Sequence, residues 1–219
     1  MAAIRAASRV AGIDTEPGPD PVAGVAGGPS AGRPARADAV RNRARLIEAA
    51  AAAFAERGEA TSLEDVAQRA GVGIGTLYRH FPTRDALVEA VYRSGVESLC
   101  EAADQLLAEL PPDRALAEWM DRFVSYVATK RGMLTALRAL LDADATLFDD
   151  CRACLEATAA RMLGAAAESG FVRRDVDAGD LLRAMGGICM ATDASHRTDQ
   201  LRPLVGLLLD GLRFGATRG

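Results

Sequence analysis

From about residue 38 onward, apolar residues recur at three- and four-residue spacing, the pattern of amphipathic helices. In the first such segment Ile47, Ala51 and Phe54 fall on one side, and Gly58 is placed to end the helix. No segment alternates apolar and polar residues with a period of two between turn signals, as a half-buried strand would. The pattern therefore predicts an all-α fold.

Caps and helix breakers divide this pattern further. Ser62 is expected to cap a short helix that stops at Gly71, and a second short helix runs from about Gly73 to His80. Pro82 blocks its continuation, so the long fourth helix begins after it and reaches about residue 107. Five more helices are predicted, at about 113–130, 133–141, 146–168, 177–194 and 199–215.

The chain divides into three parts by composition. Residues 1–37 are rich in Ala, Gly and Pro and have few large apolar groups to bury, which predicts a disordered tail. Residues 38–94 form an N-terminal domain of three short helices and the start of the fourth. Residues 95–219 form a larger helical domain.

Charge and composition narrow the class of protein. The net charge of −4 argues against wholesale nonspecific nucleic-acid binding, and residues 38–94 balance eight Arg against eight acids. No stretch approaches the roughly 18 uninterrupted apolar residues of a membrane span, and no signal peptide is evident. The four cysteines are too few and too dispersed for a disulfide framework. We expect a cytoplasmic, reduced protein with no membrane partner.

The segment from Ser62 to Phe81 has the form of a helix, a glycine turn and a second helix. Ala67 is small enough to let the two helices cross closely, and Gly71 permits the left-handed backbone of a tight turn. Packing of the first helix against Leu77 leaves one face of the second helix exposed, with side chains that suit a DNA major groove and its phosphates. That face carries Ile74, Gly75, Thr76, Tyr78, Arg79 and His80.

The run Gly71-Val-Gly-Ile-Gly-Thr-Leu-Tyr-Arg-His-Phe, followed by Thr83-Arg-Asp-Ala-Leu, closely resembles the DNA-binding domain of TetR-family transcriptional regulators. The resemblance covers about Asp38 to Val91, and Thr76-Leu-Tyr with His80-Phe is its most specific part. The family pattern often has Ser where this chain has Gly73, which removes a cap or phosphate contact.

The resemblance implies a role for each matching residue. Ile74, Gly75 and Thr76 would face base edges, while Tyr78 and His80 would bond phosphates. Arg84 would add a basic phosphate contact at the start of the fourth helix, and Ser62 would cap its helix and touch the DNA backbone. Arg45 is a further candidate. The predicted DNA-binding residues are Arg45, Ser62, Gly73, Ile74, Gly75, Thr76, Tyr78, Arg79, His80 and Arg84.

The last two predicted helices carry apolar repeats that indicate a homodimer interface, with an ordinary intramolecular core as the alternative. Gly186-Gly187 and Gly206 lower helix propensity, and close helix approach is one reason to retain them. The repeats consist of Leu181, Met185, Ile188, Cys189 and Thr192 on one helix, and Leu201, Val205, Leu208, Leu209 and Leu212 on the other.

The middle helices are expected to enclose an effector pocket, with a filled core as the alternative. Trp119, Phe123 and Tyr126 fall on one helix stripe, and the stretch from about residue 131 to 190 resembles regulators with an SbtR-like C-terminal domain. That resemblance implies a pocket that moves the fourth helix when it is filled. The predicted ligand-binding residues are Trp119, Met120, Phe123, Tyr126, Leu137, Phe148, Met185 and Cys189.

Two further features suggest a metal site or a catalytic group, but the other residues that such a site requires are missing. Cys151 and Cys154 have C-x-x-C spacing inside a predicted helix, yet no second cysteine pair completes a zinc site. His196 stands near Asp193 and Ser195 without a nucleophile turn, so it is expected at a solvated helix end. We expect no metal, no cofactor and no catalysis.

The leading hypothesis is a repressor that a small-molecule ligand releases from a palindromic double-stranded DNA operator. One alternative is a helical enzyme or small-molecule carrier whose helix-turn-helix is vestigial. Another is an activator or global regulator that responds to no ligand.

Overall fold

The computed structural model describes residues 32–191 and 198–215. All regular structure in these residues is helical, which confirms the all-α prediction. In chain order the helices are α1 (Gly32–Arg57), the 3-10 turn η1 (Gly58–Ala60), α2 (Leu63–Arg69), α3 (Ile74–His80), α4 (Arg84–Glu109), α5 (Pro112–Arg131), α6 (Leu134–Ala143), α7 (Asp149–Glu168), α8 (Ala178–Ala191) and α9 (Thr198–Arg213).

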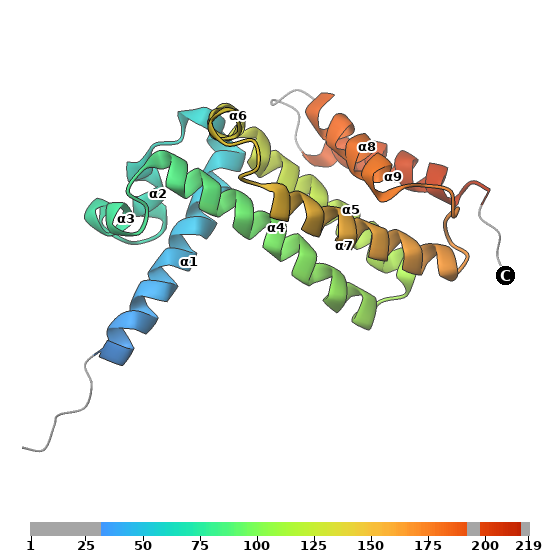
Figure 1. Cartoon of the computed structure of the whole chain (residues 1–219), viewed down its shortest axis with the longest axis horizontal. Helices are drawn as coiled ribbons and strands as arrows, with labels where there is room; N and C mark the ends of the chain where they lie inside the picture. The colour runs from blue at the N-terminus through green and yellow to red at the C-terminus, as the bar shows by residue number, and fades with distance from the viewer. Residues whose placement is uncertain (1–31, 192–197, 216–219) are drawn as a thin grey trace, which may run out of the picture.

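Figure 1 shows α1, α2 and α3 gathered at one end of the molecule and α8 with α9 at the other. The long helices α4, α5 and α7 run between these ends, and α6 crosses near the top of α1 and α4. One continuous set of buried apolar side chains extends from α1 to α9, so the two ends share a single core.

The first helix begins earlier than the sequence predicts. Residues 32–37, which the composition assigned to the tail, form the first turns of α1. Pro34 is compatible with this position because the N–H groups of a first turn have no intrahelical acceptor. The alanines that follow have the highest helix propensity of any residue, which favours extending the helix.

The end of α1 and the end of α5 meet at a glycine. A Cβ placed on Gly132 would lie 1.9 Å from the carbonyl oxygen of Phe54 and 3.2 Å from the Cα of Gly58. Gly58 has φ +60, the left-handed conformation that glycine adopts without strain. This contact fixes the three N-terminal helices against the larger helical part, and no pattern in the sequence indicated it.

Ion pairs and a disulfide join α4 to α7. Arg93 contacts Glu89 and Asp150 at 2.9 and 2.7 Å and donates to the Leu147 carbonyl. Cys100 on α4 and Cys154 on α7 form a disulfide, with their Cα atoms 6.6 Å apart. The expectation that all cysteines are reduced is therefore wrong for this pair, since two residues 54 apart in sequence meet where the helices cross.

The described helices are too short or too polar to cross a membrane. His196 and its neighbours Asp193 and Ser195 lie outside the described residues, as does Thr192.

Candidate functional site

The helix α2 is fixed by its cap and by α1. The Ser62 hydroxyl accepts a hydrogen bond from the Asp65 backbone N–H at 3.0 Å, which confirms the predicted cap. A hydrogen bond with Ser62 is the main influence that lowers the pKa of the Asp65 carboxyl, and Arg57, 2.6 Å from that carboxyl, lowers it further. Val66 and Ala67 are buried against the rest of the domain.

The turn into α3 depends on Gly71, whose φ of +66 lies in the left-handed region that glycine tolerates best. The Val72 N–H then donates to the Ala67 carbonyl at 3.0 Å, which closes α2. Leu77 and Phe81 are buried as predicted, so the inward side of α3 is fixed. Gly73 occupies the N-cap position of α3 without a side-chain hydrogen bond.

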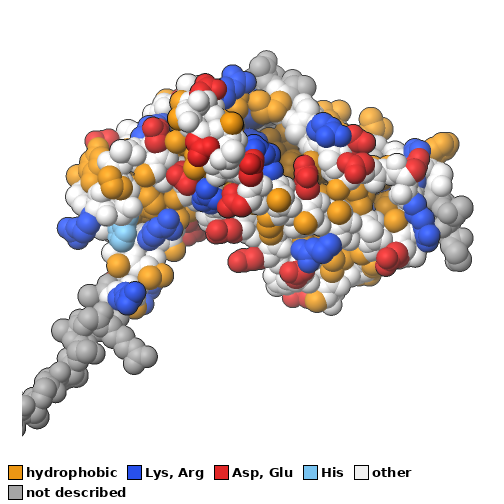
Figure 2. Space-filling view, in the orientation of Figure 1, with side chains coloured by type: hydrophobic (Ala, Val, Ile, Leu, Met, Phe, Trp, Pro, Cys, Tyr) orange, Lys and Arg blue, Asp and Glu red, His pale blue; other side chains and the backbone are white. Residues whose placement is uncertain are grey.

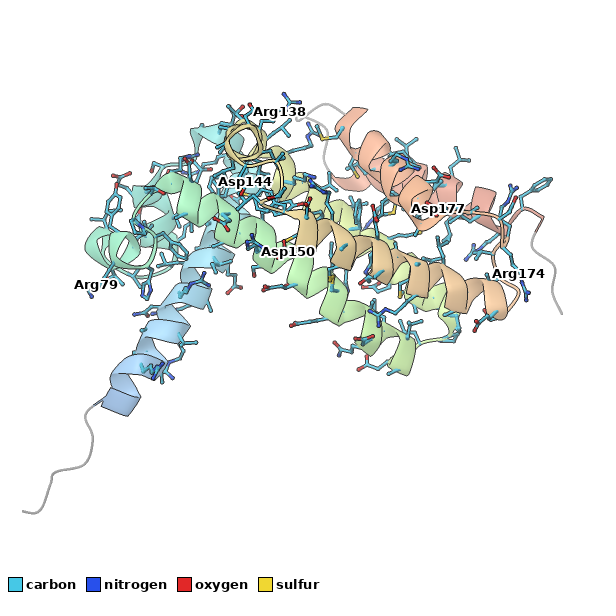
Figure 3. All side chains as sticks on the ribbon, in the orientation of Figure 1. Arg79, Arg138, Asp144, Asp150, Arg174 and Asp177 are labelled. Atoms are coloured by element: carbon cyan, nitrogen blue, oxygen red, sulfur yellow. A yellow bond between two sulfur atoms is a disulfide. The ribbon has the colours of Figure 1, made fainter. Side chains whose placement is uncertain are left out.

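The opposite side of α3 faces solvent, and we call it the α3 outer face. Ile74 is 37% exposed and Tyr78 46% exposed, large values for apolar and aromatic side chains. Figure 3 shows Arg79 at the tip of this end of the molecule, pointing away from the helices. Of the predicted candidates on α3, the structure leaves Ile74, Gly75, Tyr78 and Arg79 exposed, and Thr76 and His80 are partly buried beside them.

Ion pairing separates the arginines of residues 38–94 into two groups. Four of them, Arg41, Arg57, Arg69 and Arg93, are paired with carboxylates. Within the described residues the other four have no carboxylate partner, and they are Arg43, Arg45, Arg79 and Arg84. The balanced charge of this segment therefore conceals four cations that acids of the chain do not neutralise.

Two of these four cations flank α3 from α1. The Arg43 guanidinium lies 5.2 Å from the centroid of the Phe81 ring. Arg45 donates to the Asn42 side chain, and its Nη1 lies 4.0 Å from where Gly71 would carry a Cβ. Figure 2 shows Lys or Arg side chains on either side of the pale-blue histidine at this end of the molecule. That histidine is His80, the only histidine among the described residues.

Arg84 has a different environment from the one the resemblance implies. Its guanidinium donates to the backbone carbonyls of Thr61 and Glu59 at 2.5 and 3.2 Å. It also lies 5.3 Å from the centroid of the Phe54 ring. The side chain thus holds the turn before α2 against the start of α4, and a phosphate contact by Arg84 stays a prediction.

The predicted effector residues are mostly packed in the core. Trp119 is fully buried and donates from Nε1 to the Leu99 carbonyl at 3.0 Å. Its ring contacts Phe123, which in turn contacts Tyr126, so the predicted aromatic stripe exists. Seven of the eight predicted ligand-binding residues are at most 5% exposed: Trp119, Met120, Phe123, Leu137, Phe148, Met185 and Cys189.

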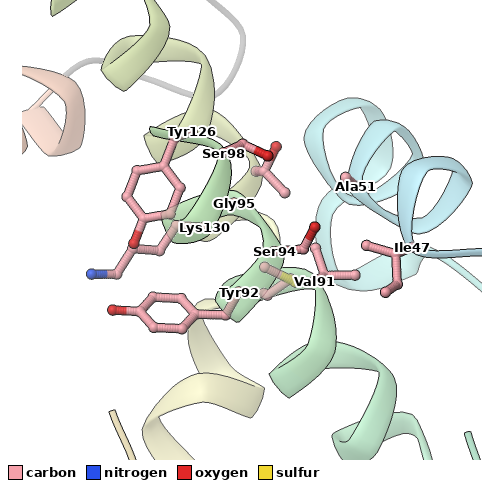
Figure 4. Close-up of a pocket in the computed structure, with 11 residues that line it drawn as sticks. Ile47, Ala51, Val91, Tyr92, Ser94, Gly95, Ser98, Tyr126 and Lys130 are labelled. Atoms are coloured by element: carbon pink, nitrogen blue, oxygen red, sulfur yellow. The ribbon is translucent and has the colours of Figure 1, made fainter. Parts of the chain in front are cut away.

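Of the eight predicted effector residues, Tyr126 lines a cavity that lies nearer the N-terminal helices than expected. This cavity of about 140 Å³ has walls from α1, α4 and α5 (Figure 4). Its lining residues are Ile47, Ala51, Val91, Tyr92, Ser94, Gly95, Ser98, Tyr126, Thr129, Lys130 and Met133. Met120 lines a separate groove between α5 and α9. The cavity therefore borders α1 directly, which the sequence could not indicate.

The outer surface of α8 and α9 is apolar, and only part of the predicted repeat, including Ile188 and Leu208, lies on it. Most of the predicted repeat, including Leu181, Met185 and Leu212, packs inward on the chain's own core. The exposed stripe is offset from it and includes Leu204 at 43% and Leu207 at 70% exposure. A hollow lined by Ala184, Ile188, Leu204, Leu207, Leu208 and Gly211 joins the two helices.

Models of two protein families match this chain. Residues 46–91 match the bacterial regulatory proteins of the tetR family, and residues 111–214 match the C-terminal domain of SbtR-like transcriptional regulators. The chain is also similar to the HTH-type transcriptional repressor KstR2 of Rhodococcus jostii, with 35% identity over 77 residues, 35% of this chain and 38% of that protein. The HTH-type transcriptional regulator TtgR of Pseudomonas putida is 43% identical over 75 residues, 34% of each chain.

These curated relatives are matched over only about a third of their own length, but two solved structures match almost whole. The TetR transcriptional regulator SCO0520 from Streptomyces coelicolor is 42% identical, with a TM-score of 0.71 over 78% of this chain and 98% of that one. A TetR transcription regulatory protein from Mycobacterium vanbaalenii is 36% identical, with a TM-score of 0.64 over 82% and 99%. The chain belongs to the TetR family of bacterial transcriptional regulators.

Proposed function

We propose that this regulator is a repressor that binds a palindromic DNA operator as a homodimer and is released by a small-molecule effector. The observation that carries the proposal is the α3 outer face, where exposed aromatic and guanidinium groups and partly buried hydroxyl and imidazole groups stand beside unneutralised arginines. A helix of this length, with its first turn exposed, suits insertion into a major groove. As a regulator of transcription it would act in the cytoplasm, with no cofactor.

The glycines at the start of α3 support this role. A Cβ on Gly73 or Gly75 would meet nothing within 4 Å, so no packing inside the chain requires a glycine at either position. Glycine in a helix costs up to about 1 kcal/mol relative to alanine. Close approach of another molecule to this part of the backbone accounts for Gly75, whereas Gly73 is the N-cap of α3, a position that tolerates glycine. In this proposal Gly75 lies against base edges with Ile74 and Thr76.

Of the remaining predicted DNA-binding residues, some would contact DNA phosphates and others hold the helices in position. Tyr78 and His80 would bond phosphates from the outer face, and Arg79 would add an unpaired charge. Arg45 would reach the same backbone from α1. Ser62 and Arg84 chiefly hold α2 and α4 in position, because their polar groups are already bonded within the chain.

The homodimer is proposed from the apolar stripe on α8 and α9. Leu207 is 70% exposed, and such a side chain gains free energy when a partner covers it. Gly187 and Gly211 have open space where a Cβ would stand, so a second copy could approach the helices closely. Two copies related by a two-fold axis would present their α3 helices to half-sites about one helical turn apart.

The effector role is proposed from the cavity between α1, α4 and α5. Because Ile47 and Ala51 of its wall belong to α1, a molecule that fills the cavity changes the packing of the DNA-binding helices on α4. The alternatives, a regulator that responds to no ligand or one that activates transcription, would use the same operator-binding surface.

The test is to select sequences bound by the full chain from random DNA and then measure the binding of variants to the selected site by gel shift. Thr76→Ala should weaken binding by roughly 5- to 100-fold and relax the preference at one position of each half-site. Ser169→Ala, far from α3 at the end of α7, is the control and should change nothing. Enrichment of no common sequence, or unchanged binding by Thr76→Ala, would contradict the assignment.

A further inference from the structure

Lys130 is the only lysine of the chain, and its side chain is partly buried. Its ammonium is 5.5 Å from the centroid of the Tyr92 ring, and no carboxylate among the described residues pairs with it. The charged group that acts on it is Arg152, which carries the same sign. Burial is the main cause that lowers the pKa of Lys130, and the charge of Arg152 lowers it further.

A second polar group in the same place also lacks a well-formed hydrogen bond. The Tyr126 hydroxyl is buried, makes no hydrogen bond of good geometry among the described residues, and has the Tyr92 hydroxyl as its polar neighbour. Burial is the main cause that raises the pKa of Tyr126, so the group is a neutral O–H donor at physiological pH. A buried polar group without a partner costs about 1–3 kcal/mol, and folded proteins seldom retain one without a use.

Asp150, which acts electrostatically on the neighbouring Tyr92, does not supply the missing negative charge. Asp150 is 2.7 Å from Arg93, which also bonds Glu89, so both carboxylates are already neutralised. A hydrogen bond to the Cys151 backbone is the main cause that lowers the pKa of Asp150. The region around Lys130 and Tyr126 therefore offers one ammonium and one O–H donor to an anion.

The adjoining cavity gives the size and polarity of that anion. Figure 4 shows the polar ends of Tyr92, Tyr126 and Lys130 on one side, with Ile47 and Ala51 on the other side toward α1. The cavity of about 140 Å³ is close to the roughly 150 Å³ of an engineered apolar cavity in another protein that binds benzene. Gly95 preserves this space, because a Cβ there would lie 3.0 Å from Tyr126 Cδ2.

We propose that this site binds a small monocarboxylate with an apolar body about the size of one benzene ring. The carboxylate accepts hydrogen bonds from the Lys130 ammonium and the Tyr126 hydroxyl. The apolar body lies among Ile47, Ala51 and Val91, in contact with α1. This inference specifies the chemical class of the proposed effector, and its regulatory consequence rests on the proposed function.

Benzoate is the probe, and calorimetry on the full chain measures its binding without DNA. Lys130→Met keeps the length of the side chain and removes the charge, and it should weaken benzoate binding at least about tenfold. Tyr126→Phe keeps the ring and should weaken binding severalfold, which provides a test even if Lys130→Met does not fold. Arg138→Met, which removes an exposed positive charge on α6, is the matched control and should bind as the parent does.

Benzyl alcohol, of similar shape and without charge, should bind more weakly than benzoate. The inference is overturned if benzoate does not bind at millimolar concentration, or if Lys130→Met and Tyr126→Phe bind it as tightly as the parent chain. It is overturned as well if benzyl alcohol binds as tightly as benzoate.

Operator binding is a separate measurement on the selected DNA site. Benzoate should lower the affinity of the parent chain for the operator and leave that of Lys130→Met unchanged. Benzoate binding without any change in operator affinity would support the site and contradict its role as an effector site. Absence of operator binding altogether would contradict the proposed function and leave the calorimetric result standing.

Discussion

The α3 outer face and the cavity beside Lys130 both present polar groups that the chain does not satisfy, but at very different cost. Arg79 and Tyr78 are exposed, so water bonds their polar groups and the free state bears no penalty. The Tyr126 hydroxyl is buried, and Lys130 is partly buried without a carboxylate partner, so both groups reduce the free energy of unfolding.

This difference in energetic cost determines how strongly each region, taken alone, indicates a binding site. Exposed arginines and tyrosines occur on many proteins, so the outer face acquires meaning from its position on α3 and from the family of the chain. A partly buried cation with no carboxylate partner, beside a buried hydroxyl, is uncommon and points to a ligand through its own chemistry. The two regions meet at α1, whose Ile47 and Ala51 line the cavity and whose Arg45 lies beside the turn before α3.

The largest effect is expected from substitutions on α9, outside both the α3 outer face and the cavity. Leu204→Asp with Leu207→Asp places two charges on the apolar stripe of α9 and should separate the dimer. At equal protomer concentration the operator affinity should fall on the order of 100-fold, because two half-sites then bind independently. Light scattering gives the mass of the parent and the variant, with Val40→Asp on α1 as an exposed control. A parent chain that is monomeric at micromolar concentration would contradict the proposed interface.

The junction between the two regions is tested at Gly132. Gly132→Ala forces a Cβ against the Phe54 carbonyl, so the free energy of unfolding should fall by about 1–3 kcal/mol. Gly164→Ala on α7, where a Cβ meets nothing within 4 Å, is the matched control and should stabilise the chain slightly. Urea unfolding followed by circular dichroism measures both. Equal stability of the two variants would show that the ends of α1 and α5 do not pack as described.

Gly75→Ala should affect stability and DNA binding in opposite directions. The alanine should raise the free energy of unfolding by up to about 1 kcal/mol, because it favours the helix and meets nothing in the chain. Operator affinity should fall, since the added methyl group stands where α3 would approach the bases. Thermal unfolding and gel shift on the same preparation measure the two effects. A variant that is more stable and binds equally well would remove Gly75 from the interface.

The smallest effect is a dependence of stability on pH. Because the pKa of Lys130 is lowered in the fold, the unfolded chain binds more protons between that lowered pKa and the ordinary value of 10.5. The stability of the parent chain should therefore rise through this pH window relative to Lys130→Met. The difference between the two should be constant well below the window. Urea unfolding at a series of pH values measures it, and parallel curves throughout would place the ammonium in solvent.

The sequence predicted the helix-turn-helix well because its geometry is set by contacts close in the chain. The Ser62 cap, the Gly71 turn and the burial of Leu77 involve residues within twenty positions of one another, so local pattern and sterics determine which side of α3 is exposed. The helix order beyond it was also correct, with boundaries that differ by a few residues.

The effector region was predicted less well because cavities depend on how distant helices pack. Trp119 and Phe148 are of residue types that often line binding pockets, but here both side chains are buried in the packed core. No role was predicted for Lys130 from the sequence, although it is the only lysine of the chain. The same limit applied to the Cys100–Cys154 pair and to Gly132, whose partners lie far away in sequence.

The most direct test of the central claim is the salt dependence of operator binding for the parent chain, for Tyr78→Phe with Arg79→Ala, and for Arg213→Ala as a control at the far end of α9. Each lost contact between a cationic side chain and a phosphate lowers the magnitude of the slope of log affinity against log salt concentration by about 1, and the loss of the uncharged Tyr78 hydroxyl lowers the affinity alone. We predict a weaker and flatter dependence for the α3 double variant and an unchanged one for Arg213→Ala. Identical slopes and affinities for all three would show that the outer face of α3 does not contact DNA.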